Sequence, residues 1–395
     1  MNPVIDLNKE YGIVLEGGGA KGAYQVGAWR ALVEAGVKIK GISGTSVGAL
    51  NGAMMCMGAL DQAEELWKNL TYSKVINVED EQMEKILDRD FEAIRNAIPN
   101  MAEIVGERGL DIAPLRRLIE ENIDEEKIRT SNRELYIKTF RVDDFKELDI
   151  DLKKAEPGRM KDYLLASAYL FPVFRNERLH GKRYLDGGIV NNVPLDSLVK
   201  RGYEDIIMIR IFGLGRSKKV KIPQGTTVYS IEPKTNLGSI LEFNGKKCAY
   251  NIKLGYFDTK RLIYGLKGSI YYIEENQEEC YYLKHLLQLS RHGLERLVYG
   301  FHRKEEESQW LRCMCETILP QLASDLKLPK KWNYKDLYIA CLEATAIICN
   351  IPKLKIYTLE ELEGMVSEKI KEMHLMDKKE MPLFSVFFDE ECKKE

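Results

Sequence analysis

A serine set between two glycines is the residue of this 395-residue chain that is best suited to nucleophilic chemistry. Ser46 forms the pattern G-x-S-x-G with Gly44 and Gly48. This pattern is typical of a sharp strand-to-helix turn that exposes the serine hydroxyl. A serine hydroxyl is a poor nucleophile unless a positioned base takes its proton. The pattern therefore predicts acyl transfer, with a base and an anion-stabilising site supplied by other segments.

A glycine-rich run before this serine is the candidate anion-stabilising site. It consists of Gly17, Gly18, Gly19, Ala20, Lys21 and Gly22. Backbone N–H groups of such a run can hold the negative charge that develops on a carbonyl oxygen during acyl transfer. We interpret Gly17, Gly18, Gly19 and Gly22 as an oxyanion hole. Lys21 either reinforces the positive potential of this loop or is a solvated lysine at the start of a helix.

An aspartate is a better candidate for the base than any histidine. The five histidines are His180, His285, His292, His302 and His374, and nothing around the last four favours any one of them. We interpret His180 as a structural residue. Asp186 ends a strand-like run and is followed by Gly187 and Gly188, which allow its carboxylate to approach another backbone closely. By itself this motif is also a common turn signal.

The same glycine run has a second interpretation, because it fits the G-x-G-x-x-G pattern of dinucleotide-binding proteins. That fold needs an acidic residue about 20 positions later to bind the ribose. The following strand instead carries Lys38 and Lys40 and leads to Ser46. Lys21 is not followed by serine or threonine, which excludes a P-loop. Dinucleotide binding is therefore the less favoured reading.

Taken together, the three motifs resemble those of the patatin-like phospholipase family, in its bacterial type. The segment Ala166 to Pro172 resembles the small-residue and proline stretch that precedes the aspartate in that family. The resemblance covers about residues 11–231, with weaker similarity to residue 258. It implies a lipid acyl hydrolase of the phospholipase A or lysophospholipase kind, which needs no cofactor and no metal. It also implies a dyad of Ser46 and Asp186, with Gly187 and Gly188 supporting the base.

The elements around the motifs predict an α/β fold with a mainly parallel central sheet flanked by helices. A buried strand over residues 11–16 is followed by an amphipathic helix to about residue 33, a strand at 38–42 and a core helix at 49–60. A helix between two strands is most simply a right-handed crossover, which makes the strands parallel. Further strands are predicted at 135–142, 183–185, 206–212 and 228–231.

Two other regions are predicted to be helical. Residues 61–132 are charged and interrupted by proline and glycine, and we expect them to cap the site. After about Ser269 strand signals become rare. We therefore predict a catalytic domain at 1–268 and a helical C-terminal extension at 269–395, whose last residues, 387–395, should fray.

Composition limits the class of protein further. A hydrophobic content of 45% and a formal net charge of -2 indicate a folded core and give no field that would attract nucleic acid. Eight dispersed cysteines favour reduced thiols. The N-terminus has no secretory pattern, so we expect a cytoplasmic protein.

The sequence leaves several properties of the protein open. An apolar acyl chain would suit a pocket lined by Leu50, Met54, Tyr169 and Phe171, although such positions are more often simple core. Peripheral membrane contact, through Leu70, Tyr72 and Val75 or through Trp310 and Leu311, is one open question, and homo-oligomerisation is another. The alternative function is a non-catalytic lipid-binding or regulatory module.

Overall fold

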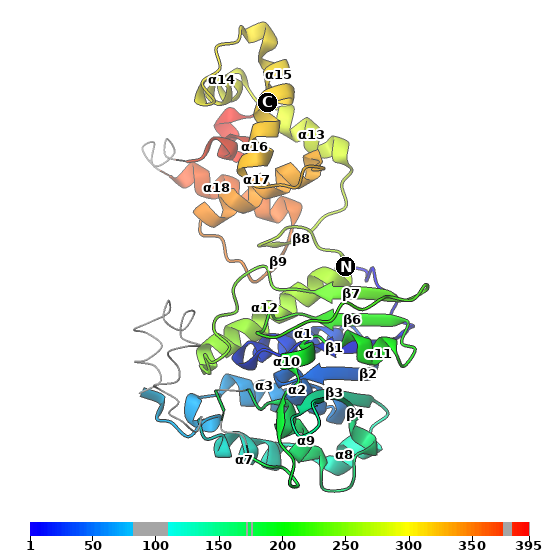
Figure 1. Ribbon diagram of the computed structural model, residues 1–395. Coiled ribbons are helices and arrows are strands. Elements are labelled where there is room, and N and C mark those ends of the chain that lie inside the picture. The colour runs from blue at the N-terminus through cyan, green and yellow to red at the C-terminus, as the bar shows by residue number, and fades with distance from the viewer. Residues whose placement is uncertain (82–109, 171–172, 175–176, 374–380, 395) are drawn as a thin grey trace. The chain divides into compact units, whose positions relative to one another are not determined.

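The computed structural model describes residues 1–81, 110–170, 173–174, 177–373 and 381–394. The chain divides into two compact units, one of residues 2–263 and the other of residues 264–395 together with Met1. We call them the N-terminal unit and the C-terminal unit and describe each separately. The three sequence motifs all lie in the N-terminal unit (Figure 1).

The N-terminal unit is built on a mostly parallel sheet, as the sequence predicted. Its strands are β1 (Glu10–Leu15), β2 (Lys38–Thr45), β3 (Glu134–Arg141), β4 (Lys146–Asp151), β5 (Tyr184–Asp186), β6 (Asp205–Ile209) and β7 (Thr227–Ile231). Within the described residues the strand order is β4-β3-β2-β1-β6-β7, with β5 also paired to β3. The pairs β1–β2, β1–β6, β2–β3 and β6–β7 are parallel, whereas β4 and β5 run antiparallel to β3.

Helices flank this sheet (Figure 1). They are α1 (Ala23–Glu34), α2 (Val47–Met57), α3 (Leu60–Lys68), α7 (Ala113–Asn122), α8 (Glu125–Thr130), α9 (Met160–Ser167), α10 (Gly188–Asn191), α11 (Leu195–Val199) and α12 (Gly245–Tyr264). Short 3-10 turns are η1 (Gly19–Gly22), η2 (Tyr72–Lys74) and η4 (Leu152–Lys154).

Both faces of the sheet are apolar, because a parallel sheet is covered on both sides. Val14 on β1 belongs to a buried cluster with Leu198 of α11. Its neighbour Leu15 points to the other face, where it lies near Gly52 of the core helix α2. This explains the uninterrupted run of buried residues along β1.

Some element bounds differ from the sequence prediction for identifiable reasons. Strand β2 continues to Thr45 because Gly44 and Thr45 still pair with β3. Strand β6 ends at Ile209 instead of residue 212, because the backbone N–H groups of Ile211 and Phe212 donate to a side chain described below. Strand β4 was not predicted at all. Its sequence, KELDID, is polar and only partly buried, which is usual for a strand at the edge of a sheet.

The C-terminal unit is mostly helical, as predicted, although it also contains a small parallel sheet. The strands are β8 (Tyr272–Glu274) and β9 (Ile356–Thr358). The helices are α13 (Glu279–Leu287), α14 (Arg291–Gly300), α15 (Trp310–Cys313), α16 (Leu319–Asp325), α17 (Tyr334–Ile348) and α18 (Leu359–Glu372). Shorter helical turns are η5 (Glu307–Gln309), the π-helical η6 (Met314–Ile318), η7 (Leu383–Phe388) and η8 (Glu390–Cys392).

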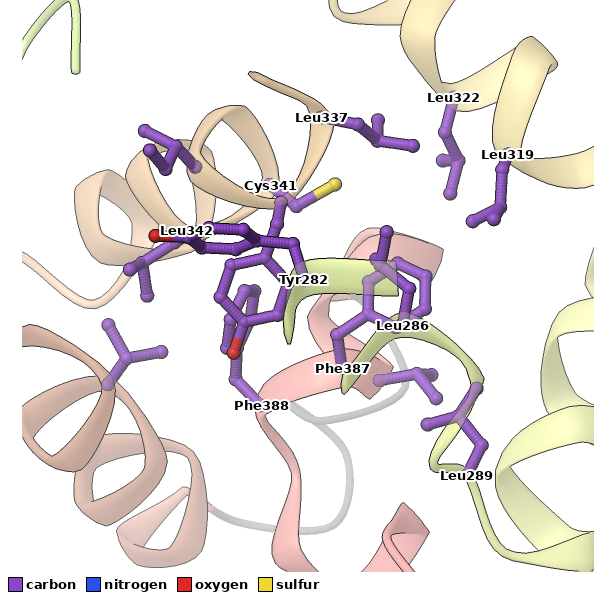
Figure 2. Packing of buried hydrophobic residues seen from close by; sticks show 14 of the residues in the cluster. Tyr282, Leu286, Leu289, Leu319, Leu322, Leu337, Cys341, Leu342, Phe387 and Phe388 are labelled. Atoms are coloured by element: carbon purple, nitrogen blue, oxygen red, sulfur yellow. The ribbon is translucent and has the colours of Figure 1, made fainter. Parts of the chain in front are cut away.

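The C-terminal unit has a hydrophobic core of its own (Figure 2). Tyr282 and Leu286 of α13 pack with Cys341 of α17 and with Phe387 and Phe388 of η7. Phe387 and Phe388 are almost fully buried, so the prediction that the tail frays from residue 387 is wrong. The aromatic pair supplies apolar area that this unit buries between α13 and α17.

Two further features concern membrane-spanning helices and the state of the cysteines. Among the described residues, no helix combines the length and the apolar character needed to cross a membrane. The eight cysteines are all free thiols.

Candidate active site

Ser46 lies in the sharp turn between β2 and α2 (Figure 1). Its backbone has φ 55° and ψ −126°, a conformation that L-residues rarely adopt and that is often found at functional sites. Glycine is required on both sides. A Cβ on Gly44 would lie 2.3 Å from the Gly48 carbonyl oxygen, and a Cβ on Gly48 would lie 2.3 Å from the Leu15 carbonyl oxygen. The G-x-S-x-G pattern thus follows from the steric demands of this turn and of its close packing against β1.

Asp186 is the last residue of β5, and its side chain is 6% exposed. Its carboxylate accepts a hydrogen bond from the Gly188 backbone N–H, with N to Oδ1 2.7 Å. Burial raises the pKa of Asp186 to about 6, although hydrogen bonding by the Ser46 side chain and the Gly188 N–H opposes the shift. The sequence motifs on β2 and β5 therefore come together, and the aspartate has a pKa suited to proton transfer near neutrality.

Strand β3 is the common support for both residues. Asp186 pairs with Thr139 on this strand, and a Cβ on Gly187 would lie 2.5 Å from the Lys138 carbonyl oxygen. On the other side, the Ser46 backbone N–H donates to Ser167 Oγ at 2.9 Å, and the Ser167 hydroxyl donates to the Lys138 carbonyl at 2.7 Å. Ser167 was not assigned a role from the sequence, because its partner is 121 residues away.

The glycine-rich run divides into residues that face the pocket and residues that do not. Gly18 and Gly19 line the pocket together with Ser46 and Asp186. Within the described part of the chain, the N–H groups of Gly18 and Gly19 have no backbone or side-chain acceptor. The Gly17 N–H, in contrast, donates to the Asn192 carbonyl at 3.1 Å. It is not available for an oxyanion, which corrects the expectation for Gly17.

Gly22 also has a packing role. A Cβ there would lie 2.5 Å from Val47 Cγ2, and its carbonyl accepts a hydrogen bond from Asn51 Nδ2 at 2.9 Å. Gly22 does not line the pocket. Its glycine therefore allows η1 and α1 to approach α2 closely, which differs from the expected role in the oxyanion hole.

Glu16 and Lys21 hold the segment behind Gly18. The buried Glu16 carboxylate accepts hydrogen bonds from Arg210 Nε at 2.9 Å and from the N–H groups of Ile211 and Phe212 at 2.8 and 3.0 Å. Lys21 Nζ donates to the Phe212 carbonyl at 2.8 Å. Burial lowers the pKa of Lys21, while the Glu16 carboxylate opposes that shift. Lys21 thus supports the loop, and it does not line the pocket.

The pocket beside Ser46 is largely apolar and has an empty volume of about 1130 Å³, part of it open to solvent. Leu50 and Met54 line it as expected, whereas Tyr169 does not, and Phe171 lies outside the described residues. The described part of the region 61–132 contributes to the wall through Ala63, Leu66 and Trp67 of α3 and Leu115, Leu118 and Ile119 of α7. The expectation that this region caps the site also involves residues 82–109, which lie outside the described residues.

The residues that the sequence offered for membrane contact are mostly buried. Leu70 and Val75 line the pocket, and Tyr72 and Trp310 are also buried. Of this set Leu311 alone is exposed. These side chains stabilise the interior, so that suggestion is wrong for four of the five.

Among the described residues, histidine takes no part in the pocket. None of its described lining residues is a histidine. His180 is exposed, and its Nε2 lies 2.6 Å from Asp162 Oδ2. His180 thus lies outside the described pocket lining and pairs with Asp162.

Comparison with known proteins finds similarity over parts of the chain. Residues 13–199, a little under half of the chain, match the sequence model of the family described as patatin-like phospholipase. The chain is 53% identical over 51 residues to a lysophospholipase nte1 of Aspergillus terreus and 51% identical over 45 residues to a neuropathy target esterase sws of Drosophila persimilis. These alignments cover 13% and 11% of this chain, and only 3% of each relative.

Among solved structures, VipD from Legionella pneumophila aligns with most of the chain, with a TM-score of 0.41 and 15% sequence identity over 96% of this chain and 90% of that one.

Proposed function

We propose that residues 13–199, a patatin-like phospholipase domain, supply the core of a lipid acyl hydrolase in which Ser46 is the nucleophile and Asp186 is the base. The observation that carries the proposal is the meeting of a strained, pocket-lining serine with a buried aspartate whose pKa is raised to about 6. A carboxylate with a higher pKa is a stronger base, which partly makes up for the absence of histidine from the described lining residues.

The first half of the reaction forms an acyl-enzyme. Ser46 Oγ attacks the ester carbonyl as its proton passes to Asp186. The N–H groups of Gly18 and Gly19 hold the oxygen that becomes negative, and one such donor contributes about 2.7–4 kcal/mol to acyl transfer. When the tetrahedral intermediate collapses, Asp186 returns the proton to the alcohol that leaves.

The second half releases the acid. A water molecule gives its proton to Asp186 and attacks the acyl carbon, and the same two N–H groups hold the second oxyanion. Collapse of this intermediate expels Ser46 Oγ, which recovers the proton from Asp186. The products are a carboxylic acid and the free enzyme.

The pocket indicates what the acyl group is. Its wall from α2, α3 and α7 is mostly apolar, with Asn51 and Asn122 as its polar members, and a fatty acyl chain loses contact with water there. We therefore propose carboxylic esters of lipids as substrates, of the phospholipase A or lysophospholipase kind.

The proposal is tested with a serine-directed fluorophosphonate and a panel of phospholipid and short-chain esters. Wild-type protein should be labelled at Ser46 and release fatty acid. Ser46→Ala and Asp186→Asn should lose turnover, whereas Ser230→Ala, a change on the exposed face of β7, should keep it. Turnover by Ser46→Ala, or labelling at another serine, would contradict the dyad. Binding of lipid without turnover in the wild type would favour a non-catalytic lipid-binding module instead.

A further inference from the structure

Large apolar side chains are exposed beside the pocket. Phe212 is 49% exposed, Leu214 is 60% exposed and Ile189 on α10 is 41% exposed. Leu214 also lines the pocket. The Arg216 N–H donates to the Gly188 carbonyl at 2.9 Å, so the segment after Leu214 adjoins the turn that carries Asp186. These side chains therefore lie on one side of the proposed active site.

The exposure of Phe212 is imposed by the fold. Phe212 has φ 48°, a conformation that an L-residue keeps only where its surroundings enforce it. Glu16 accepts its N–H and Lys21 donates to its carbonyl. A Cβ on Gly213 would lie 1.8 Å from the Gly17 carbonyl oxygen, so the next residue is pressed against the glycine-rich run. A buried carboxylate and a lysine thus hold an aromatic residue in solvent at the edge of the pocket.

Positive charge follows these apolar side chains. Residues 210–231 contain five cations and no acidic residue, although the whole chain has a formal net charge of -2. Arg210 pairs with Glu16, and Lys218 pairs with Glu147. The other three, Arg216, Lys219 and Lys221, are exposed and have no carboxylate partner among the described residues.

We propose that residues 212–222, which we call the interfacial loop, dock the protein on the surface of a bilayer that contains anionic phospholipid. Phe212 and Leu214 enter the interface, and the cations contact the lipid phosphates, because this combination of apolar and basic groups is what an anionic membrane surface attracts. The proposal rests on the proposed function, since docking here presents the pocket to its lipid substrate.

Vesicle binding tests the proposal. The full chain carrying Ser46→Ala, which leaves the lipid intact, is mixed with vesicles of equal parts phosphatidylglycerol and phosphatidylcholine, or with phosphatidylcholine vesicles. Three basic residues near an anionic surface are together worth about 100-fold in binding. We expect the charge variant, Arg216→Gln with Lys219→Gln and Lys221→Gln, to lose about that much on the anionic vesicles.

The aromatic residue is tested by Phe212→Asn. Asparagine tolerates a positive φ better than most residues, so this change removes the ring and keeps the backbone. We expect about tenfold weaker binding or more, because an inserted apolar side chain is lost.

Two control variants change residues near the other ends of the strands, where β2 begins and β4 ends. The first control removes three exposed cations, as the charge variant does, by Lys40→Gln, Lys127→Gln and Lys154→Gln. The other is Val33→Gln, at an exposed position near the end of α1. Both should bind anionic vesicles as the parent does.

Several outcomes would overturn the proposal: equal binding to neutral and anionic vesicles, no binding to either, or a charge variant as strong as the parent. A change of oligomeric state in Phe212→Asn with vesicle binding unchanged would assign the loop to self-association, and the membrane proposal would fall.

Activity separates this proposal from the proposed function. When the charge variant keeps Ser46, it should hydrolyse a soluble short-chain ester at the same rate as the wild type. It should hydrolyse anionic vesicles at least tenfold more slowly than the wild type does. Equal rates of vesicle hydrolysis would contradict the interfacial loop. A parent that binds anionic vesicles yet hydrolyses no soluble ester would instead refute the proposed function and leave the loop intact.

Discussion

Asp186→Asn should abolish turnover and, at the same time, stabilise the protein at alkaline pH. The carboxylate is buried, and desolvation raises its pKa from 3.8 to about 6. A folded-state pKa above the unfolded value means that the folded protein prefers the protonated form. This preference stabilises the fold fully below pH 3.8 and is lost as the pH rises through about 6. Above that pH, folding must bury a charged carboxylate.

The size of the effect follows from the shift. A shift from 3.8 to about 6, at 1.36 kcal/mol per pKa unit, corresponds to about 3 kcal/mol. Asparagine resembles the protonated side chain in shape. Its Oδ1 can accept from the Gly188 N–H and its Nδ2 can donate to Ser46 Oγ. We therefore expect Asp186→Asn to be more stable than the wild type by about 3 kcal/mol at pH 8, with the difference disappearing near pH 4.

The assay is urea unfolding between pH 4 and pH 8, followed by tryptophan fluorescence. Trp310→Phe and Trp332→Phe are introduced into every variant, so that the remaining tryptophans, Trp29 and Trp67, both report on the N-terminal unit. Ser46→Ala is the matched control, because it loses turnover but keeps the buried carboxylate. It should show no gain at pH 8. A stability difference for Asp186→Asn that is independent of pH, or a loss of stability at pH 8, would refute the reasoning.

Three further results are expected. Because Asp186 must be ionised to accept a proton and its pKa is about 6, kcat/KM for a soluble ester should fall about tenfold per pH unit below pH 6 and level off above it, and a flat profile from pH 5 to pH 8 would contradict this. Gly19→Ala places a Cβ 2.1 Å from the Ile240 carbonyl oxygen at φ 55°, and kcat should drop at least about 100-fold. The control is Gly36→Ala, which is also at positive φ but in open space. It should reduce the free energy of unfolding by about 1–2 kcal/mol and leave kcat unchanged. Ala63→Phe fills the pocket wall at a buried position, so it should lower kcat/KM for long-chain relative to short-chain esters by about tenfold, and unaltered chain-length preference would show that the acyl chain lies elsewhere.

Much of the framework could be predicted from the sequence, because its causes are local. The Gly44 position is required by a contact inside one strand-to-helix turn, where a Cβ would meet the Gly48 carbonyl oxygen. The buried run of β1 and the apolar helix α2 show directly in the side-chain pattern. Parallel pairing of β1 with β2 then follows from the helix between them.

Contacts between residues that are distant in sequence determine features of the site and of the core that local patterns do not predict. The Gly17 N–H is occupied because Asn192 comes from beyond β5. The sequence places Glu16 at the end of a strand but does not identify its partners, and only the return of residues 210–212 shows that it organises the loop behind Gly18. Phe387 and Phe388 sit in a charged tail, yet helices that begin some 100 residues earlier bury them.

The sequence by itself therefore determined the elements around the motifs, the position of the nucleophile turn and the types of the reacting residues, since the patterns that indicate them lie within a few positions of one another. Tertiary structure alone decided which amides remain available, how far the pKa of Asp186 rises and which side chains form the pocket wall. These properties depend on desolvation and on hydrogen-bond partners, and both are supplied by segments that meet only when the chain is folded.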